Sequence, residues 1–494
     1  MLAWTIYSSF IGVFALTLVR ANNPRAARIT ALLTALVGLA AAVGGFVQHK
    51  ADSGIVTVTK LPWIKSLGID YYLAADGISV TLVLLTGIAA VVGILFSWNI
   101  ENRAKEFFAF YLSLIGGVYG VFLSFDLFLL FVFYELAIIP KYFLIAIWGS
   151  TNKEYGAMKL ALYSFIGSAM VLIGLVAAYV VAGARTTDLL ALASFPFPES
   201  FQYWAFPLVF IGFAILAGLW PFHTWAPAGH VAAPTAASML LAGVVMKLGA
   251  YGALRVAMTL FPLGLKEWQV EIGFLAVVGI VYGAMVALVQ KDFKFVIGYS
   301  SVSHMGFVLL GLVTLNTVGL SGAVLQMFSH GIIAGLLFAV VGRMVYDRTH
   351  TRELGKLQEM DLGRALPFAS VTFIIASVAS MGLPGFSGFV AELQVLIGAW
   401  HAFPAFALFA GLGIVIGVAY TLRALQKSFF SDIEVKSVKH ARPFEPISTP
   451  ERIGGAVLIA STLVVGLYPR LLLDLIVPSF NSPLFDALRK GGGL

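Results

Sequence analysis

The chain has 494 residues, of which 60% are hydrophobic and only 11% are charged. Soluble domains carry about 25% charged residues, so this composition excludes a soluble globular protein and is typical of a membrane protein. Cysteine is absent, which excludes disulfides, thiolate-held iron–sulfur clusters and a cysteine nucleophile in this chain. Any redox chemistry therefore belongs to a partner.

Apolar stretches of about 20 residues, the length that crosses a bilayer, recur along the whole chain. We predict fourteen spans, at residues 2–19, 28–47, 77–98, 106–124, 126–149, 158–183, 203–224, 233–260, 271–290, 294–315, 317–345, 366–397, 402–425 and 453–475. Basic residues follow the first span instead of preceding it, which is the reverse of a secretory signal, so we expect this span to be uncleaved. The predicted fold class is an all-α polytopic membrane protein.

Lysine and arginine predict the orientation of these spans. Of 31 such residues, 20 fall in loops that leave odd-numbered spans and 9 fall on the opposite face. Cytoplasmic loops are the ones enriched in Lys and Arg, so we predict an inner-membrane protein with both termini in the periplasm. The same rule accounts for the net charge of +7 without a nucleic-acid partner.

Proline interrupts two of the spans, the seventh at Pro221 and the twelfth at Pro384. Because they lie five spans apart, residues 106–260 (helices 4–8) and 271–425 (helices 9–13) are predicted to form two inverted five-helix repeats. Residues 1–105 then hold helices 1–3, and residues 426–494 hold a cytoplasmic loop and helix 14. Inverted repeats with broken helices are typical of transporters, and proline kinks that only shape packing are the alternative.

Three charged residues are expected near the middle of spans: Glu135 in FVFYELAIIP, Lys247 in MLLAGVVMKLGAYG and Glu392 in GFSGFVAELQVLIG. An unpaired charge there is costly, so each is protonated, paired across helices or hydrated. All three states suit a proton relay. The alternative is a static interhelical salt bridge.

Three histidines extend this pattern. His304 in YSSVSHMG and His330 in MFSHGIIAG are mid-span and flanked by hydroxyl groups, and His223 in WPFHTWAP borders the break in the seventh span. A neutral imidazole can pass a proton between its two nitrogens. Packing hydrogen bonds, or a cap on freed backbone at His223, are the alternatives. We do not expect a metal site, because these histidines form no i, i+3 or i, i+4 pair.

Four long segments, in order, resemble one family over essentially the whole chain: DLFLLFVFYELAIIPKYFLIAIWG, WPFHTWAPAGHVAAPTAASMLLAGVVMKLGAYG, IGYSSVSHMGFVLLG and LPGFSGFVAEL. The chain is similar to the antiporter-like membrane subunits of respiratory complex I, NADH:quinone oxidoreductase. Glu392 in the second broken helix and the short tail after the last span resemble the subunit M (subunit 4) branch. The resemblance implies a proton path through Glu135, Lys247 and Glu392, with His304 and His330 on a hydrated central axis.

One departure from the family pattern concerns helix seven, where the resemblance implies a lysine as the partner of Glu135. Leu216 stands at that position, whereas Lys141, just after Pro140, stands where the family has an uncharged residue. We hypothesise that Lys141 replaces the missing partner. The alternative is that Lys141 extends to the cytoplasmic interface.

As the resemblance implies, this chain holds no cofactor, and NADH, flavin, iron–sulfur clusters and quinone belong to partner subunits. The expected partners are L-type and N-type membrane-arm neighbours and lipid. The predicted function is proton translocation driven by redox chemistry in those other subunits. The alternatives are a cation/proton antiporter, a subunit of a membrane-hydrogenase type complex, or a structural subunit that no longer pumps.

Overall fold

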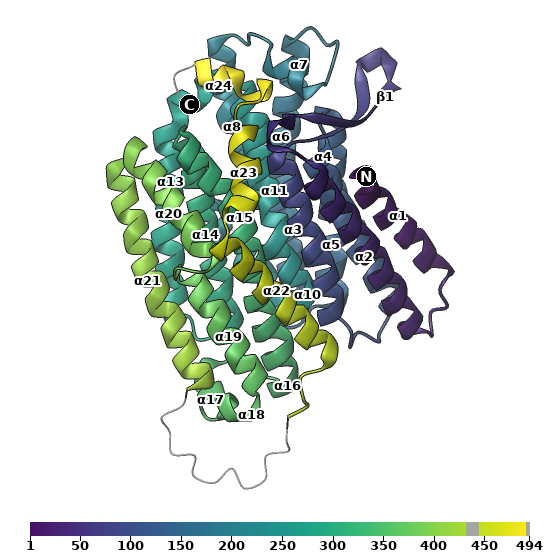
Figure 1. Ribbon diagram of the computed structural model, residues 1–494, viewed down its shortest axis with the longest axis vertical. Coiled ribbons are helices and arrows are strands. Elements are labelled where there is room, and N and C mark those ends of the chain that lie inside the picture. The colour runs from purple at the N-terminus through teal and green to yellow at the C-terminus, as the bar shows by residue number, and fades with distance from the viewer. Residues whose placement is uncertain (431–443, 491–494) are drawn as a thin grey trace.

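The computed structural model describes residues 1–430 and 444–490, and helices dominate it (Figure 1). In chain order they are α1 (Ala3–Leu18), α2 (Pro24–Gln48), α3 (Gly77–Phe96), α4 (Ala104–Leu123), α5 (Leu127–Trp148), α6 (Lys153–Val181), α7 (Leu189–Ala193), α8 (Glu199–Ala217), α9 (Trp225–Ala232), α10 (Thr235–Leu240), α11 (Met246–Gly252), α12 (Met258–Leu260), α13 (Pro262–Val289), α14 (Phe293–Val313), α15 (Thr317–Phe338), α16 (Asp347–Thr349), α17 (Leu354–Gln358), α18 (Leu362–Ala365), α19 (Pro367–Ser380), α20 (Ser387–Ala402), α21 (Pro404–Phe429), α22 (Thr449–Leu467), α23 (Arg470–Ser479) and α24 (Asp486–Lys490).

Within the described residues, twelve helical segments are long and apolar enough to cross a membrane, and α1 and α19 are shorter apolar helices. Each of the fourteen predicted spans overlaps a helical segment, so the polytopic helical fold class is confirmed. The count of fourteen crossings and the inverted repeat stay predictions.

One element of the fold is not helical. Strands β1 (Val56–Ile64) and β2 (Ile69–Ala75) form an antiparallel hairpin in which Lys60 pairs with Tyr72. The Lys60 ammonium lies 2.6 Å from the Asp188 carboxylate at the start of α7. This bond raises the pKa of Lys60. The alternation of VTVTK in this segment is typical of a strand, and the segment is shorter than a membrane span.

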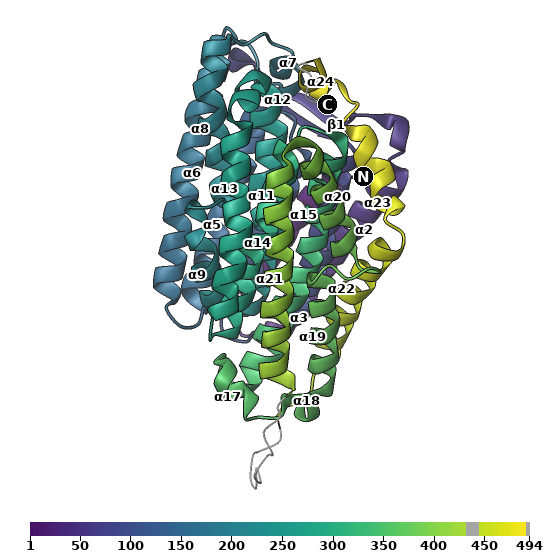
Figure 2. The ribbon, with the colours of Figure 1, turned by 90° about the vertical axis from the view of Figure 1, so that its left-hand side faces the viewer.

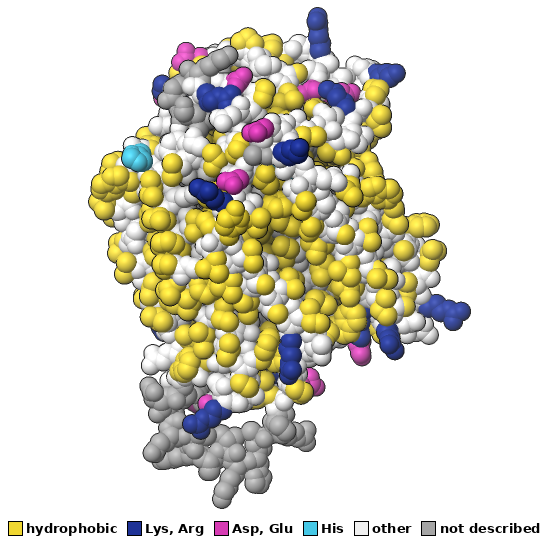
Figure 3. All heavy atoms as spheres, in the orientation of Figure 1, with side chains coloured by type: hydrophobic (Ala, Val, Ile, Leu, Met, Phe, Trp, Pro, Cys, Tyr) yellow, Lys and Arg dark blue, Asp and Glu magenta, His cyan; other side chains and the backbone are white. Residues whose placement is uncertain are grey.

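The bundle has two ends that differ in structure (Figures 1 and 2). We call the end that carries β1, α7 and α24 the hairpin face, and the end that carries α16, α17 and α18 the loop face. Between them, hydrophobic side chains form a belt, and the charged side chains lie mostly above and below it (Figure 3). Such a belt is the surface expected of a chain that spans a bilayer.

Both predicted helix breaks are present. Helix α8 ends before Gly218, whose φ is +86°, and α19 ends before Gly382, whose φ is +70°. Glycine adopts this left-handed backbone without a steric penalty, so it ends each helix before the following proline is reached. The chain resumes as α9 in the first break and as α20 in the second.

The eighth span contains a second irregularity. Two π-helical segments, η4 (Leu241–Val245) and η5 (Ala253–Ala257), flank α11, and the most apolar stretch of this span is completely buried. A third π segment, η6 (Ala339–Tyr346), continues α15. The wider turn of a π segment shifts side chains around the helix and often marks a functional site.

Candidate functional site

Lys247 lies at the centre of the bundle, on α11 between the two π segments, and its side chain has no exposed surface. Its Nζ atom donates to the Ala242 carbonyl and lies 2.8 Å from Nδ1 of His330 on α15. Among the described residues these polar contacts are a carbonyl and an imidazole, so no carboxylate balances the ammonium group directly. The lysine is therefore not held in a static salt bridge there.

Two stacked histidines continue from Lys247. The rings of His330 and His304 have centroids 5.3 Å apart and planes 7° apart. His304 Nδ1 donates to the Ser300 carbonyl at 2.8 Å, and its Nε2 atom lies 3.2 Å from the Ser380 carbonyl. Because carbonyl oxygens only accept, each ring nitrogen of His304 faces an acceptor to which it can donate.

Glu392 ends this series of groups. One of its carboxyl oxygens, Oε1, lies 3.4 Å from His304 Nε2 and accepts from the Gln326 amide at 3.3 Å. The other, Oε2, packs against the second break, where a Cβ on Gly382 would approach it to 2.9 Å. The acid is 5% exposed. The break therefore positions the carboxyl group at the histidine.

We call Lys247, His330, His304 and Glu392 the buried row. It joins four spans, on α11, α15, α14 and α20, by contacts between neighbouring side chains. Each member can gain or lose one proton. An excess proton can thus reside at any of four adjacent positions, which is the arrangement a relay needs.

Glu135 and Lys141 both lie on α5, apart from the buried row, and the described residues contain no hydrogen bond or ion pair between them. Glu135 is partly exposed, and its nearest polar influences are the Ser168 hydroxyl on α6 and the Lys141 ammonium. Lys141 is 1% exposed and its Nζ atom has no hydrogen-bond partner in the part of the chain that is described. The lysine therefore points into the bundle and does not extend to the interface. Leu216 is also buried and is only 1% exposed.

His223 lies in η3 (Phe222–Thr224) within the first break. It is 2% exposed and faces the rings of Tyr282 and Tyr299, with centroids 5.3 and 6.3 Å away. Its two nitrogens have no hydrogen-bond partner among the residues described. No contact joins it to the buried row within that part of the chain.

Sequence reasoning missed His230 and Lys294. His230 on α9 is fully buried, and the charges of both Lys247 and Lys294 act on it. Lys294, counted with the loops, is 2% exposed at the start of α14 and donates to the Ala233 carbonyl at 3.0 Å. In the sequence, His230 stands in AGHVAAP and Lys294 stands directly before an apolar run. Neither lies near the middle of a predicted span, so a search for mid-span ionisable residues does not find them.

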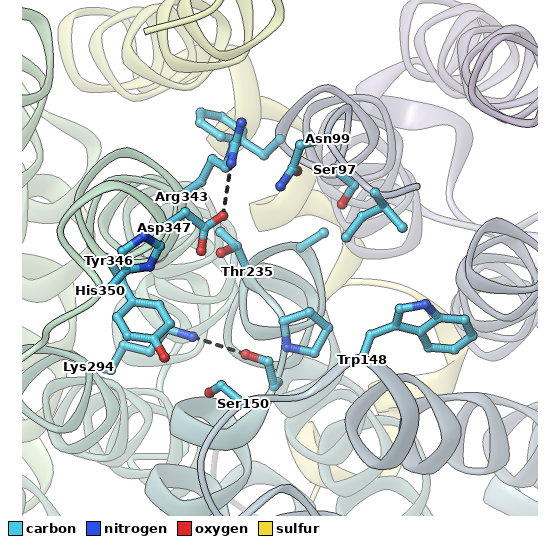
Figure 4. A pocket seen from close by; sticks show the side chains of 15 residues that line it. Ser97, Asn99, Trp148, Ser150, Thr235, Lys294, Arg343, Tyr346, Asp347 and His350 are labelled. Carbon is cyan, nitrogen blue, oxygen red and sulfur yellow. Dashed lines mark hydrogen bonds and ion pairs between the residues drawn. The ribbon is translucent and has the colours of Figure 1, made fainter. Parts of the chain in front are cut away.

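A cavity of about 360 Å³ opens beside Lys294 near the loop face (Figure 4). Arg343 from η6 lines it and pairs with Asp347 at 3.0 Å, and Thr235 and His350 are among its other polar lining residues. Lys294 lines this cavity. The charges of Lys294 and Lys247 both act on His230, so three buried ionisable groups lie near one another on the loop-face side of the buried row.

Comparison with known proteins gives concordant similarities. Residues 124–417 match the family described as NADH:quinone oxidoreductase/Mrp antiporter, TM. The chain is 38% identical over 471 residues to NADH-quinone oxidoreductase subunit M of Rhodobacter capsulatus, covering 93% of this chain and 90% of that one. It is 34% identical over 480 residues to the subunit M of Rickettsia prowazekii, covering 95% of this chain and 96% of that one.

Solved structures show the same similarity. A chain of respiratory complex I from Thermus thermophilus aligns with a TM-score of 0.88 and 27% identity, covering 98% of this chain and all of that one. A chain of the Mrp complex from Dietzia sp. aligns with a TM-score of 0.85 and 21% identity, covering 98% of this chain and 97% of that one. The second likeness concerns the fold alone.

Proposed function

Because this chain belongs to the family of membrane subunits shared by NADH:quinone oxidoreductases and Mrp antiporters, as the sequence predicted, we propose that it is a proton-translocating subunit M in the membrane arm of a complex I type enzyme. The buried row carries this proposal. Relatives of the subunit M type match the chain over more than nine tenths of its length, which favours this function over the antiporter alternative.

Redox chemistry takes place in partner subunits, which hold NADH, flavin, iron–sulfur clusters and quinone. The neighbours in the membrane are the L-type and N-type subunits. The loop face is cytoplasmic and both termini are periplasmic, in accord with the excess of Lys and Arg in loops at that face.

Protons move along the buried row one at a time. Lys247 gives its proton to His330 Nδ1 across the 2.8 Å contact, and the amine left behind is neutral. His330 releases a proton to a water molecule at the ring edges, which passes it to His304, whose ring stacks on that of His330. His304 Nε2 then gives it to the Glu392 carboxylate. In each step one N–H bond breaks as another bond to hydrogen forms.

Proton uptake occurs from the loop face. Water in the cavity beside Lys294 delivers protons to that lysine, and His230 passes them to Lys247. The charges of Lys294 and Lys247 both act on His230, which supports its place between them in this uptake route.

Lys141 takes the place of the missing helix-seven lysine as the partner of Glu135. Its full burial and its attraction to Glu135 support this proposal. In a straight helix, positions six residues apart lie about 9 Å apart along the axis and on different sides. Pro140 stands inside α5 between the two positions, where it removes a backbone hydrogen bond, and the lysine side chain is long enough to reduce that separation.

The test uses the complete enzyme in proteoliposomes and measures protons translocated per NADH oxidised. Lys247→Met and Glu392→Gln should lower this ratio, whereas Lys356→Met and Glu359→Gln, on the loop face, should leave it unchanged. If Lys247→Met and Glu392→Gln complexes pump like their controls, the chain is a structural subunit. Lys141→Met should lower the ratio, and the double variant Lys141→Met with Leu216→Lys should restore the ratio. If neither result is observed, Lys141 does not replace the helix-seven lysine.

A further inference from the structure

A second set of buried polar groups lies between Lys247 and the hairpin face. Tyr251 and Arg255 follow Lys247 at intervals of four residues along the eighth span, and all three are fully buried. Positions four apart lie on one side of a helix, about 6 Å apart along its axis. The three side chains therefore form a line that points from the centre of the bundle towards the hairpin face.

Hydrogen bonds join this line to α3. The Tyr251 hydroxyl donates to the Phe122 carbonyl at 2.9 Å, so the Ser79 hydroxyl, 3.1 Å away, is the donor in their contact. Arg255 Nη2 donates to the Ser79 hydroxyl at 3.3 Å and forms an ion pair with Asp76. Tyr251, Ser79, Arg255 and Asp76 are thus a continuous network.

The ion pair at the end of this network is incompletely satisfied. Asp76 Oδ2 and the Nε and Nη1 atoms of Arg255 are buried, and no described residue hydrogen-bonds to them. Three aromatic rings surround the guanidinium group, those of Phe125, Tyr251 and Phe485, with distances of 5.3 to 5.8 Å. Buried charged atoms without a protein partner are normally hydrogen-bonded to ordered water. A purely structural ion pair would instead need each of these atoms paired.

The network ends beside a surface cavity. Ala75, which directly precedes Asp76, lines a cavity of about 260 Å³ together with His49 and Gln48 at the end of α2. The Asp76 charge acts on His49. Burial lowers the pKa of His49, so this imidazole is neutral at neutral pH and can accept a proton. The cavity lies at the hairpin face, opposite to the cavity beside Lys294.

We infer that Tyr251, Ser79 and the Asp76–Arg255 pair form a vertical proton path from Lys247 to the hairpin face, through which this subunit releases protons itself. The inference rests on the proposed function, because Lys247 must carry protons for the path to have a source.

Each step of the path conserves protons. Water carries a proton from Lys247 to the oxygen of Tyr251. For the phenol proton to leave towards Ser79, the Tyr251 hydroxyl turns from the Phe122 carbonyl to the Ser79 oxygen, and the Ser79 hydroxyl turns away from Tyr251. Ser79 then releases its proton through water to the Asp76 carboxylate, whose Oδ2 atom bonds no described residue. Arg255 stays positively charged, so its charge repels a proton that approaches from the hairpin face, and the proton that reaches Asp76 leaves to water and His49.

The experiment compares hydroxyl deletions in the assembled enzyme. Tyr251→Phe and Ser79→Ala each remove one relay atom without adding volume, and they should lower the protons translocated per NADH oxidised while the rate of uncoupled NADH oxidation is unchanged. Tyr119→Phe removes another buried phenol hydroxyl, and Thr81→Val removes a buried hydroxyl that bonds only its own helix, to Gly77. These two controls should keep the ratio of the unaltered enzyme.

Three outcomes distinguish a proton path from a structural network and from failure of the proposed function. A lowered ratio in Tyr251→Phe and Ser79→Ala, but not in the controls, supports the path. If Lys247→Met lowers the ratio and both deletions match their controls, the network is structural and the path is refuted, while the proposed function stands. If Lys247→Met has no effect, the proposed function and the path fail together.

Discussion

Replacing His330 with phenylalanine tests the buried row at its centre. The phenyl ring keeps the volume and the stacking on His304, where the planes are 7° apart. It removes Nδ1, which lies 2.8 Å from Lys247 Nζ. We expect the complex to assemble, with a cost of about 1–3 kcal/mol for the buried polar group left without its partner. Proton translocation should be lost while electron transfer continues.

The size of the repulsion between a protonated Lys247 and a protonated His330 follows from the distance between Nζ and Nδ1. Two unit charges at the 2.8 Å separation of Lys247 and His330 repel by about 6 kcal/mol at an effective dielectric constant of about 20. Since 1.36 kcal/mol is a factor of ten, double protonation is disfavoured by roughly 10⁴. The pair therefore holds one proton, and a proton that arrives at Lys247 expels one towards His304. Phenylalanine cannot take part in this exchange.

The assay reconstitutes the complete enzyme and follows a pH-sensitive dye in the vesicle interior during NADH oxidation. His401→Phe is the matched control, because His401 is an exposed histidine at the end of α20. His330→Phe should give a clearly lower ratio of protons to NADH than this control. Equal ratios in the two variants would refute the buried row as the proton path.

Three further predictions test neighbouring features. Gly382→Ala places a Cβ 2.9 Å from Glu392 Oε2 at a φ of +70°, so it should cost about 1–2 kcal/mol, seen as faster thermal inactivation together with a lower proton ratio. Lys60→Met should speed limited proteolysis within the hairpin, with a stability change of at most about 1 kcal/mol. The Asp188 bond raises the pKa of Lys60, so the native contact should persist below the ordinary value of 10.5 and be lost only as the pH rises through the raised one. Lys294→Met should slow proton uptake from the loop face, measured as a lower pumping rate at high pH.

The residues that sequence reasoning found share one property. Lys247 and Glu392 are charged side chains inside long apolar runs, and this pattern can be recognised in the sequence alone. Which groups they contact was not predictable, because His330 lies 83 residues from Lys247 and meets it only through helix packing. The breaks were located by proline, although a glycine with positive φ ends each helix first.

The residues that were missed lie near the ends of spans. Arg255 and Lys294 were assigned to loops, where basic residues are normally exposed, but the structure buries both. The π segment η5 turns Arg255 towards Asp76, and the Asp292 cap starts α14 just before Lys294. Neither a π segment nor an ion pair 179 residues apart in sequence leaves a periodic pattern. Burial at a helix end therefore has to be read from the fold.

The pair on α5 and the buried row are separate units, and their separation has a physical consequence. Each contains an acid and a lysine, so each is close to neutral when both groups are ionised. A proton added to Glu135 leaves Lys141 uncompensated, and its field then acts on Lys247. Two charges about 15 Å apart interact by about 1 kcal/mol at an effective dielectric constant of about 20, enough to change a protonation ratio about fivefold. Coupling between the units therefore needs no direct contact, and a lysine on α5 in place of one on helix seven would still supply the charge that transmits it.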